Sequence, residues 1–219
     1  MTAAANPDSE PGGVRAPFFF GTVFENRAAA SGATREPPET AIDVLISPRA
    51  RTDRTASTID MNFWKHFKPK ACSVQLKAKS KDEALSEVVA NMVQADVIPE
   101  ALAEAAVEAL LERERTASTG IGMNVAIPHV KLKGLERAGY SLSVHVDGLE
   151  WHAVDAAPVH ILFTVIRPEK GGDQHDPEQH LELMRWIARL SRDADFRRFA
   201  TRVKTKSELV DLLKEMSAV

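Results

Sequence analysis

The chain has 219 residues, with 28 lysines and arginines against 31 aspartates and glutamates, and a formal net charge of −3 at pH 7. This balance does not favour a nucleic-acid or membrane-surface partner, and no apolar run approaches the ~20 residues that span a bilayer. A single cysteine, Cys72, excludes an intrachain disulfide framework and fits a reducing compartment. Because the first residues also lack the basic start and apolar middle of a signal peptide, we expect a soluble, cytoplasmic protein.

Residues 1–60 differ in character from the rest of the chain. They are rich in Ala, Pro, Gly, Ser, Thr and Arg and show no sustained apolar period. Short apolar runs at 18–20 and 42–46 are too small to build a core, so we expect a disordered N-terminal tail. A sharper hypothesis is that Met61 is the true first residue and that residues 1–60 are a mis-called extension, because the composition changes there.

The folded domain is expected over residues 62–219. Residues 62–67 read as a short amphipathic turn that packs on the domain, and 74–76 as its first strand. Ser80 and Glu83 have the spacing of a capping box, which satisfies the first free N–H groups of a helix. The apolar stripe of that helix consists of Ala84, Leu85, Val88, Val89 and Met92.

A second helix follows, with Pro99 in its first turn. Its apolar stripe consists of Leu102, Ala106, Val107, Leu110 and Leu111. Arg113 then lies at the C-terminal end of this helix. Arg115 is a second arginine close by, and the sequence does not distinguish which of the two faces a site.

The stretch after this helix is the richest in chemistry. Thr119-Gly120-Ile121-Gly122 reads as a loop whose glycines let backbone N–H groups approach an anion without a Cβ in the way. Residues 125–127 read as a short apolar strand, and Pro128, which has no N–H, ends its ladder. His129 is therefore expected at a strand end beside this loop.

A histidine in this position suits phosphoryl chemistry. The unperturbed pKa of histidine is about 6.5, so most of the imidazole is neutral at pH 7 and has a lone pair that can attack phosphorus. A neighbouring guanidinium would disfavour the imidazolium and bind phosphate oxygens as a two-pronged donor. On these residues alone, a core or loop histidine with a satisfied hydrogen bond is the alternative.

The strands expected after His129 are of two kinds. Residues 140–146 alternate polar and apolar as a half-buried strand does, with His145 on the solvent side and Asp147-Gly148 as the following turn. Residues 160–166 form a nearly continuous apolar run, which is typical of a central strand buried on both faces.

The C-terminal part is expected to be helical. A polar loop at 167–178 is a candidate to cover a site, and the amphipathic helix at 180–190 has His180 in its first turn, where a lone polar residue is usually solvated. Helices at 195–203 and 207–216 complete the domain, the last with Leu209, Leu212 and Leu213 inward. The pattern predicts an α/β fold, a mixed sheet flanked by helices.

Other classes of site find little support. The chain lacks His-Glu-x-x-His and any pair of histidines at i, i+4, so we expect no metal. The Gly-x-Gly has no third glycine and precedes a strand, against a dinucleotide site, and no Gly-Lys-Ser/Thr follows. A serine hydrolase is excluded by the absence of Gly-x-Ser-x-Gly.

The motif from Ser118 to His129, preceded by Arg113-Glu114, closely resembles the enzyme IIA domain of the mannitol/fructose type. That domain belongs to the bacterial phosphoenolpyruvate:sugar phosphotransferase system and includes a nitrogen-regulatory branch. Segments 151–163 and 180–190 match two further landmarks in the right order. The resemblance covers about two thirds of the chain, from near Cys72 to the C-terminus.

The resemblance implies that His129 accepts a phosphoryl group from the small carrier HPr. His129 would pass it to a cysteine of a IIB protein or hold it as a regulatory signal, without a metal ion or organic cofactor. Arg113 would neutralise the phosphoryl oxygens and His180 would orient the imidazole or the phosphate. Donors for the phosphate are expected at Thr119, Gly120 and Gly122.

Two points of function stay open in the sequence. A regulatory binding module, in which phosphorylation changes the choice of partner, is the alternative to a transport relay. A free-standing IIA unit leans towards regulation, by analogy of fold. Val130 departs from the glycine or alanine that often follows the histidine in the family, which leaves the identity of the partner open.

Overall fold

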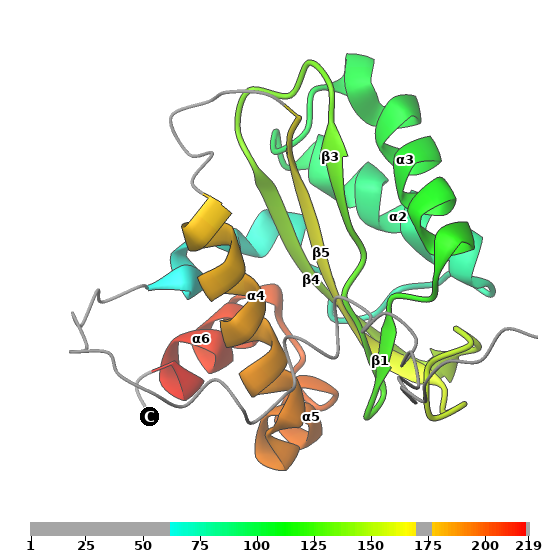
Figure 1. The fold of residues 1–219 in the computed structure, drawn as a ribbon. Helices are drawn as coiled ribbons and strands as arrows, with labels where there is room; N and C mark the ends of the chain where they lie inside the picture. Colours follow the sequence, from blue (N-terminus) through cyan, green and yellow to red (C-terminus); the bar gives the residue numbers. More distant parts are fainter. Residues whose placement is uncertain (1–61, 170–176, 218–219) are drawn as a thin grey trace, which may run out of the picture. The chain divides into compact units, whose positions relative to one another are not determined.

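The computed structural model describes residues 62–169 and 177–217. The expectations for residues 1–60 and for most of the polar loop at 167–178 lie outside this part of the chain. Figure 1 shows the arrangement of the elements. In chain order they are η1 (Phe63–His66), η2 (Pro69–Ala71), α2 (Lys81–Gln94), η3 (Glu100–Leu102), α3 (Ala103–Thr116), β1 (Gly120–Gly122), β2 (Val125–Ala126), β3 (His129–Leu132), β4 (Gly139–Leu149), β5 (Val159–Pro168), α4 (Pro177–Arg192), α5 (Ala194–Ala200) and α6 (Lys206–Met216), where η marks 3₁₀ helices.

The sheet is mixed and is built around β5. β4 pairs antiparallel with one edge of β5, while β2 and β3 pair parallel with the other edge. Ala126 lies opposite Leu162 and His129 opposite Val165, so β2 and β3 keep the same register. They behave as one strand that is interrupted at Pro128, and β1 extends the sheet as the antiparallel partner of β2.

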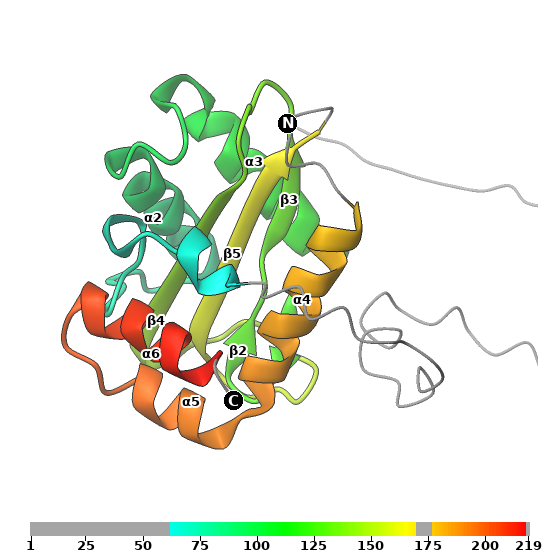
Figure 2. The same ribbon diagram turned by 90° about the vertical axis from the view of Figure 1, so that its left-hand side faces the viewer.

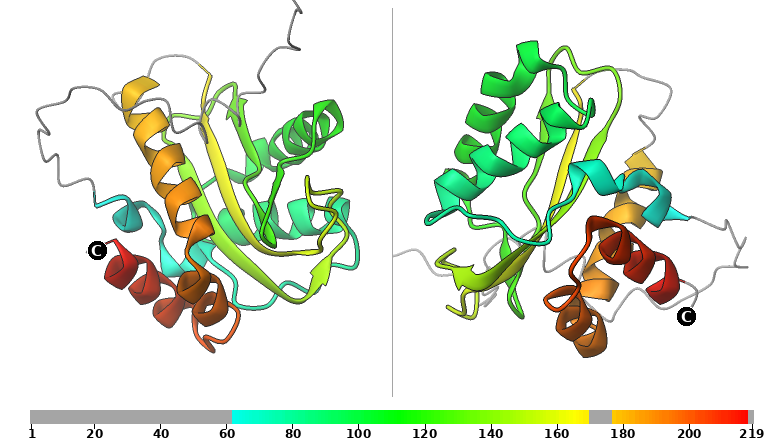
Figure 3. Two further views of the ribbon diagram at one scale, coloured as in Figure 1. Left: turned by 60° about the horizontal axis from the view of Figure 1, so that its bottom comes forward. Right: turned by 180° about the vertical axis from the view of Figure 1, so that it is seen from behind.

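Helices cover both faces of this sheet (Figures 1 and 3). Phe163 and Val165 of β5 pack in a cluster with η1, α4, α5 and α6. Leu162 and Ile166 point the other way, into a cluster with α2 and α3. Because successive side chains of a strand point to opposite faces, β5 contributes to a hydrophobic core on each face of the sheet. This confirms the predicted mixed sheet with flanking helices and the central position of β5.

The prediction for α2 agrees closely with the structure, and the prediction for α3 agrees less closely. All five residues of the α2 stripe are buried, and Ser80 Oγ accepts from the Glu83 N–H at 3.2 Å. The prediction that Pro99 lies in the first turn of the second helix is wrong, because a 3₁₀ turn, η3, intervenes and α3 begins at Ala103. Of the predicted α3 stripe, Ala106 and Leu110 are buried, and the others are half-buried.

The segment 74–76 is not a strand, contrary to expectation. It contacts β4 through an isolated bridge of Ser73 with Ser143 and a bond from the Leu76 N–H to the Val144 carbonyl. The ladder does not continue because the next N–H groups, those of Lys77 and Ala78, bond to a carboxylate of α2, that of Glu87.

The expected exposure of His145 is also wrong. Its side chain is buried, and its Nε2 lies 2.9 Å from the Ala78 carbonyl. The polar residues of β4 do share one face, but chain 71–78 and α2 cover it instead of water. Alternation in sequence shows that two faces differ, and it does not show which face meets solvent.

Asp147-Gly148 is part of β4 and does not form the expected turn. The register shifts between Val144 and Leu149, and Gly148 has φ +78°, which together indicate a bulge. The side chain of His160 holds the bulge, because its Nδ1 lies 3.0 Å from the His145 carbonyl.

The first and last elements of the described part of the chain agree with the sequence. Phe63 of η1 packs on Trp186 of α4, with ring centroids 5.7 Å apart, so the short turn at 62–67 docks as predicted. The last two helices lie at Ala194–Ala200 and Lys206–Met216, and Leu209, Leu212 and Leu213 are buried. Within residues 62–169 and 177–217, no helix combines the length and apolarity that crossing a membrane requires.

Candidate functional site

His129 opens β3, immediately after the interruption at Pro128. The expectation that it follows a strand end is therefore refined: it stands where one strand breaks and resumes. Along this edge Val125 and Ile127 point into the cluster with α4, whereas Ala126 points into the cluster with α2 and α3. By the same alternation the half-buried His129 lies on the α4 face of the sheet.

A backbone contact fixes the tautomer of His129. Its Nδ1 lies 2.8 Å from the carbonyl oxygen of Ile127. Since a carbonyl only accepts hydrogen bonds, Nδ1 carries the proton and donates it. In the neutral ring the lone pair is then on Nε2, which is the nitrogen able to attack an electrophile.

The surroundings of His129 also keep the ring neutral. Burial, the strongest influence, lowers the pKa of His129 below the ordinary 6.5, and the positive charges of Arg113 and Arg167 lower this pKa further. The hydrogen bond to Ile127 and the charge of Glu114 raise the pKa, but they are outweighed. Neutral imidazole therefore predominates at pH 7, as nucleophilic attack requires.

Of the two neighbouring arginines, Arg113 is the one whose charge acts on His129. It lies in the last turn of α3, as predicted, and its Nη1 donates to the Ala117 carbonyl at 2.8 Å. Arg115 instead pairs with Glu112 at 2.9 Å, and both of those side chains are well exposed. These contacts favour Arg113 over Arg115 as the arginine near His129, and the role of Arg113 stays a prediction.

Thr119 is engaged inside the protein. Its N–H and its hydroxyl both donate to the buried carboxylate of Glu114, the hydroxyl to Oε2 at 2.5 Å. Trp151 Nε1 donates to Thr119 Oγ1 at 3.2 Å, and Lys81 pairs with Glu114 at 3.3 Å. Sequence analysis missed this network. Glu114 interrupts the otherwise apolar buried face of α3, and this acidic residue is the signal from which the network could have been predicted.

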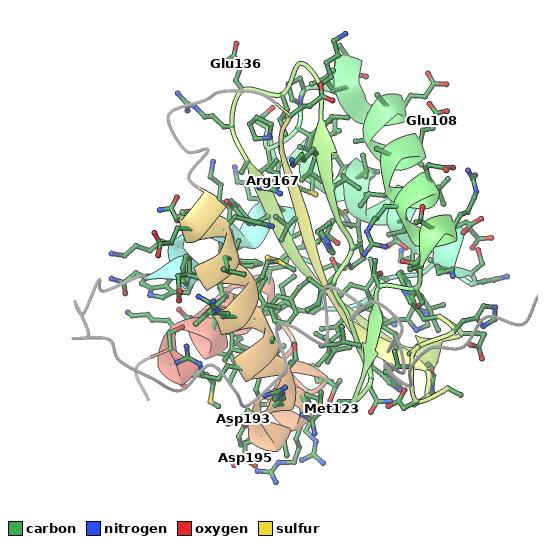
Figure 4. All side chains as sticks on the ribbon, in the orientation of Figure 1. Glu108, Met123, Glu136, Arg167, Asp193 and Asp195 are labelled. Atoms are coloured by element: carbon green, nitrogen blue, oxygen red, sulfur yellow. The ribbon has the colours of Figure 1, made fainter. Side chains whose placement is uncertain are left out.

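The two glycines of the motif lie in β1, in a hairpin and not in a loop. A Cβ on Gly120 would approach that of Ala153 to 2.7 Å, so close packing requires a glycine there, and its N–H donates to Ser118 Oγ. Gly122 has φ +84° and leads into the turn whose tip, Met123, is labelled in Figure 4. Phosphate binding by Thr119, Gly120 and Gly122 stays a prediction, and these internal contacts do not support it.

His180 is the fourth residue of α4, in the first turn of the helix, and is half-buried. α4 crosses the face of the sheet on which His129 lies (Figures 1 and 2). The fold thus puts both histidines on one face of the sheet, and the role of His180 stays a prediction.

Arg167, which sequence analysis assigned only to the polar loop, is a second arginine near His129. It belongs to β5, where it lies opposite Lys131 of β3, and Figure 4 shows it near the end of β5. Its charge acts on His129. Finding it required the register between β3 and β5, which no local pattern contains.

No group of three or more His, Cys, Asp or Glu side chains in the described ranges is placed to hold a metal ion. The chemistry available at the site is that of a neutral imidazole flanked by two guanidinium groups. Such an arrangement suits the receipt of a dianionic group at Nε2 of His129.

Comparison with known proteins identifies relatives of this domain. The nitrogen regulatory protein of Pseudomonas aeruginosa is 38% identical over 125 residues, covering 57% of this chain and 76% of the relative. The fructose-specific EIIA component of Haloferax volcanii is 31% identical over 113 residues, covering 52% of this chain and 70% of the relative.

Solved structures share the fold. The crystal structure of the nitrogen regulatory protein IIA-Ntr from Neisseria meningitidis matches with a TM-score of 0.58 and 21% identity, covering 69% of this chain and 98% of that one. IIA mannitol from Escherichia coli matches with a TM-score of 0.53 and 17% identity, covering 67% and 98%.

A family model covers most of the described domain. Residues 65–216 match the model described as phosphoenolpyruvate-dependent sugar phosphotransferase system, EIIA 2. The relatives named above bear sugar-transport and nitrogen-regulation names, in agreement with that match. The chain therefore belongs to the EIIA type 2 family of the phosphoenolpyruvate-dependent sugar phosphotransferase system.

Proposed function

We propose that this protein is a phosphocarrier in which Nε2 of His129 receives a phosphoryl group from the phosphohistidine of an HPr-like protein. One observation carries the proposal: the bond from Nδ1 to the Ile127 carbonyl leaves the lone pair on Nε2. Burial and two arginine charges lower the pKa of the same ring and keep that lone pair available.

The bonds and electron pairs of the proposed transfer can be accounted for without a cofactor. The donor reacts as a phosphoimidazolium with a proton on its other ring nitrogen; its P–N bond breaks, the electron pair returns to that ring, and the donor leaves as neutral imidazole. The lone pair of His129 Nε2 forms the new P–N bond, and the ring becomes a phosphoimidazolium that keeps its proton on Nδ1. That proton continues to bond to the Ile127 carbonyl, which stabilises the cationic ring.

Arg113 and His180 complete the proposed reaction centre. Arg113 neutralises oxygens of the group in transfer, where positioned cations contribute most. His180, from the helix that covers this face of the sheet, orients the imidazole or the phosphate. Neither role needs a metal ion.

The fate of the phosphoryl group has two candidate answers. A structural neighbour was solved as a complex of IIA mannitol with phosphorylated IIB mannitol, which supports onward transfer to a IIB cysteine. A relative that is 36% identical, from Bradyrhizobium diazoefficiens, is a nitrogen regulatory protein, like the Pseudomonas one. We therefore propose regulation of a target protein as the second candidate, with phosphorylation changing the partner.

The test is transfer from phospho-HPr to purified variants, followed by intact mass. His129→Ala should take up no phosphoryl group. Arg113→Ala should react about 10- to 100-fold more slowly, since positioned cationic donors have effects of this order, while Arg115→Ala serves as the matched control and should react like the wild type. We expect a slower but detectable reaction for His180→Ala.

Uptake by His129→Ala at the wild-type rate would show that another residue is the acceptor. An unaltered rate in His180→Ala would return His180 to the role of a helix surface residue. If the wild type is phosphorylated but passes nothing to any IIB protein, a pull-down with phosphorylated and unphosphorylated protein should yield different partners, as the regulatory candidate requires.

A further inference from the structure

Arg167 lies diagonally across from His129 on the same face of the sheet. His129 pairs with Val165, and Arg167 follows Val165 by two residues in β5, so its side chain leaves the same face. Strand spacing and rise put the Cα atoms of His129 and Arg167 about 8 Å apart. An extended arginine side chain covers this distance.

The guanidinium of Arg167 has no carboxylate partner within the described residues. Neither a hydrogen bond nor an ion pair joins it to another of those residues, although the side chain is half-buried. Burial lowers the pKa of Arg167, which reflects the cost of placing this cation away from water. A half-buried cation that has no counter-ion among the described residues is favourable for an anion that arrives from outside.

Aromatic side chains pack together on the β4 side of Arg167. Tyr140 of β4 also lies opposite Val165, so three neighbouring strands present His129, Val165 and Tyr140 in one row. The Tyr140 ring packs on His66 with centroids 4.9 Å apart. Charges act more strongly beside such packed side chains than in open water.

We propose that Arg167 is a second phosphate-binding arginine, which together with Arg113 holds the phosphoryl group on Nε2 of His129. The two guanidinium groups come from different elements, Arg113 from the end of α3 and Arg167 from the end of β5. Each binds oxygens of the same dianion as a planar two-pronged donor. This inference rests on the proposed phosphocarrier function.

The test compares Arg167→Gln with the wild type in phosphorylation by phospho-HPr. We expect the rate to fall about tenfold, equivalent to about 1.4 kcal/mol of barrier, and the phosphorylated form to hydrolyse at an altered rate. Arg167→Lys keeps the positive charge but loses the planar two-pronged donor, so its rate of phosphorylation should be intermediate. Arg202→Gln, at an exposed arginine between α5 and α6, is the matched control and should leave the rate unchanged.

A second readout does not need phosphorylation. NMR titration of the His129 ring should give a higher pKa in Arg167→Gln than in the wild type, because a cation that opposes protonation is gone. The other charged or titratable groups to follow in the same spectra are Arg113, Glu114 and, on the facing helix α4, His180. The spectra also report whether the variant is folded.

The outcomes separate the inference from the function on which it rests. A wild type that takes no phosphoryl group overturns both. A wild type that is phosphorylated, together with an Arg167→Gln variant of equal rate and equal His129 pKa, overturns only the role of Arg167. A slower Arg167→Gln that Arg167→Lys partly restores supports the two-arginine site.

Discussion

At His129 the tautomer and the protonation state are set by different neighbours. The Ile127 carbonyl holds the proton on Nδ1, whereas burial and the charges of Arg113 and Arg167 disfavour a second proton on the ring. The hydrogen bond by itself would favour the charged ring, so the lowered pKa means that burial and charge outweigh it. The residue is thereby held both oriented and neutral.

This balance predicts the pH dependence of phosphate acceptance. Because the pKa of His129 is lowered from 6.5, the neutral ring predominates down to pH 6.5, and the midpoint of any loss of the intrinsic rate of attack should lie below pH 6.5. The rate should fall at more acidic pH, as the ring protonates. Transfer from phospho-HPr, measured against pH with the donor's own titration subtracted, checks this.

The NMR titration of His129 is the companion measurement. A midpoint at or above 6.5 would contradict the account of the site, since it would mean that burial and the two arginine charges do not outweigh the Ile127 hydrogen bond and the charge of Glu114.

At the residue scale, sequence was sufficient where chemistry is local. The order of Arg113, the glycine motif and His129 was enough to name a candidate acceptor and a candidate arginine, whose roles stay predictions. It was insufficient for Arg167, whose relation to His129 depends on strand pairing. It was also insufficient for Thr119, whose partners Glu114 and Trp151 lie on other elements.

At the scale of elements, β1 connects the end of α3 to the strand that bears His129. Glu114, in α3, anchors Thr119 at the start of this connection. The Thr119 carbonyl in turn accepts the N–H of Ile127, the residue that orients the imidazole. The position of the His129 ring therefore depends indirectly on the contact between Glu114 and Thr119.

These contacts predict that Thr119 and Gly120 act through stability. Thr119→Val removes the hydroxyl that bonds to a buried carboxylate, which should cost about 1–3 kcal/mol. Gly120→Ala brings a Cβ to 2.9 Å from the backbone Cα of Ala153, and such overpacking costs about 1–3 kcal/mol. Urea denaturation measures both losses, and the folded variants should still be phosphorylated.

Matched controls make these losses interpretable. Thr119→Ser keeps the hydroxyl and should lose little. Gly139→Ala is an overpacking variant outside the motif, because its Cβ would meet Met92 Cε and Val97 Cγ1 at 2.8 Å, and it should lose stability without a change in phosphorylation of the folded protein. Wild-type stability with abolished phosphorylation in both Thr119→Val and Gly120→Ala would instead support the predicted phosphate-binding role of these residues.

Elements with a strong period were predictable and elements shaped by their neighbours were not. The apolar stripe of α2 is compatible only with a helix buried on one side, and the apolar run of β5 only with a strand buried on both faces. Both predictions agree with the structure. Segment 74–76 has strand-like residues, but Glu87 takes the N–H groups that follow it. The covered polar face at His145 depends on packing of chain 71–78, which no local window contains.

At the scale of the whole domain, the site draws on both layers of helices. Arg113 comes from α3, which packs on one face of the sheet, and His180 from α4, which packs on the other. The proposed service of both residues to one histidine fits the fold, because β3 has β5 as its only strand partner among the described residues and its other edge is not covered by a strand. A mixed sheet with an interrupted edge strand is thus the feature of the fold on which the proposed site depends.

The most direct test of the central claim is phosphorylation of the wild-type protein from phosphoenolpyruvate through enzyme I and HPr. The product should be examined by intact mass, peptide mapping and ³¹P NMR. The account predicts the addition of one phosphoryl group, located on His129 and bonded to Nε2. A folded protein that gains no mass beside active HPr, or that carries the group on another residue or on Nδ1, would contradict it.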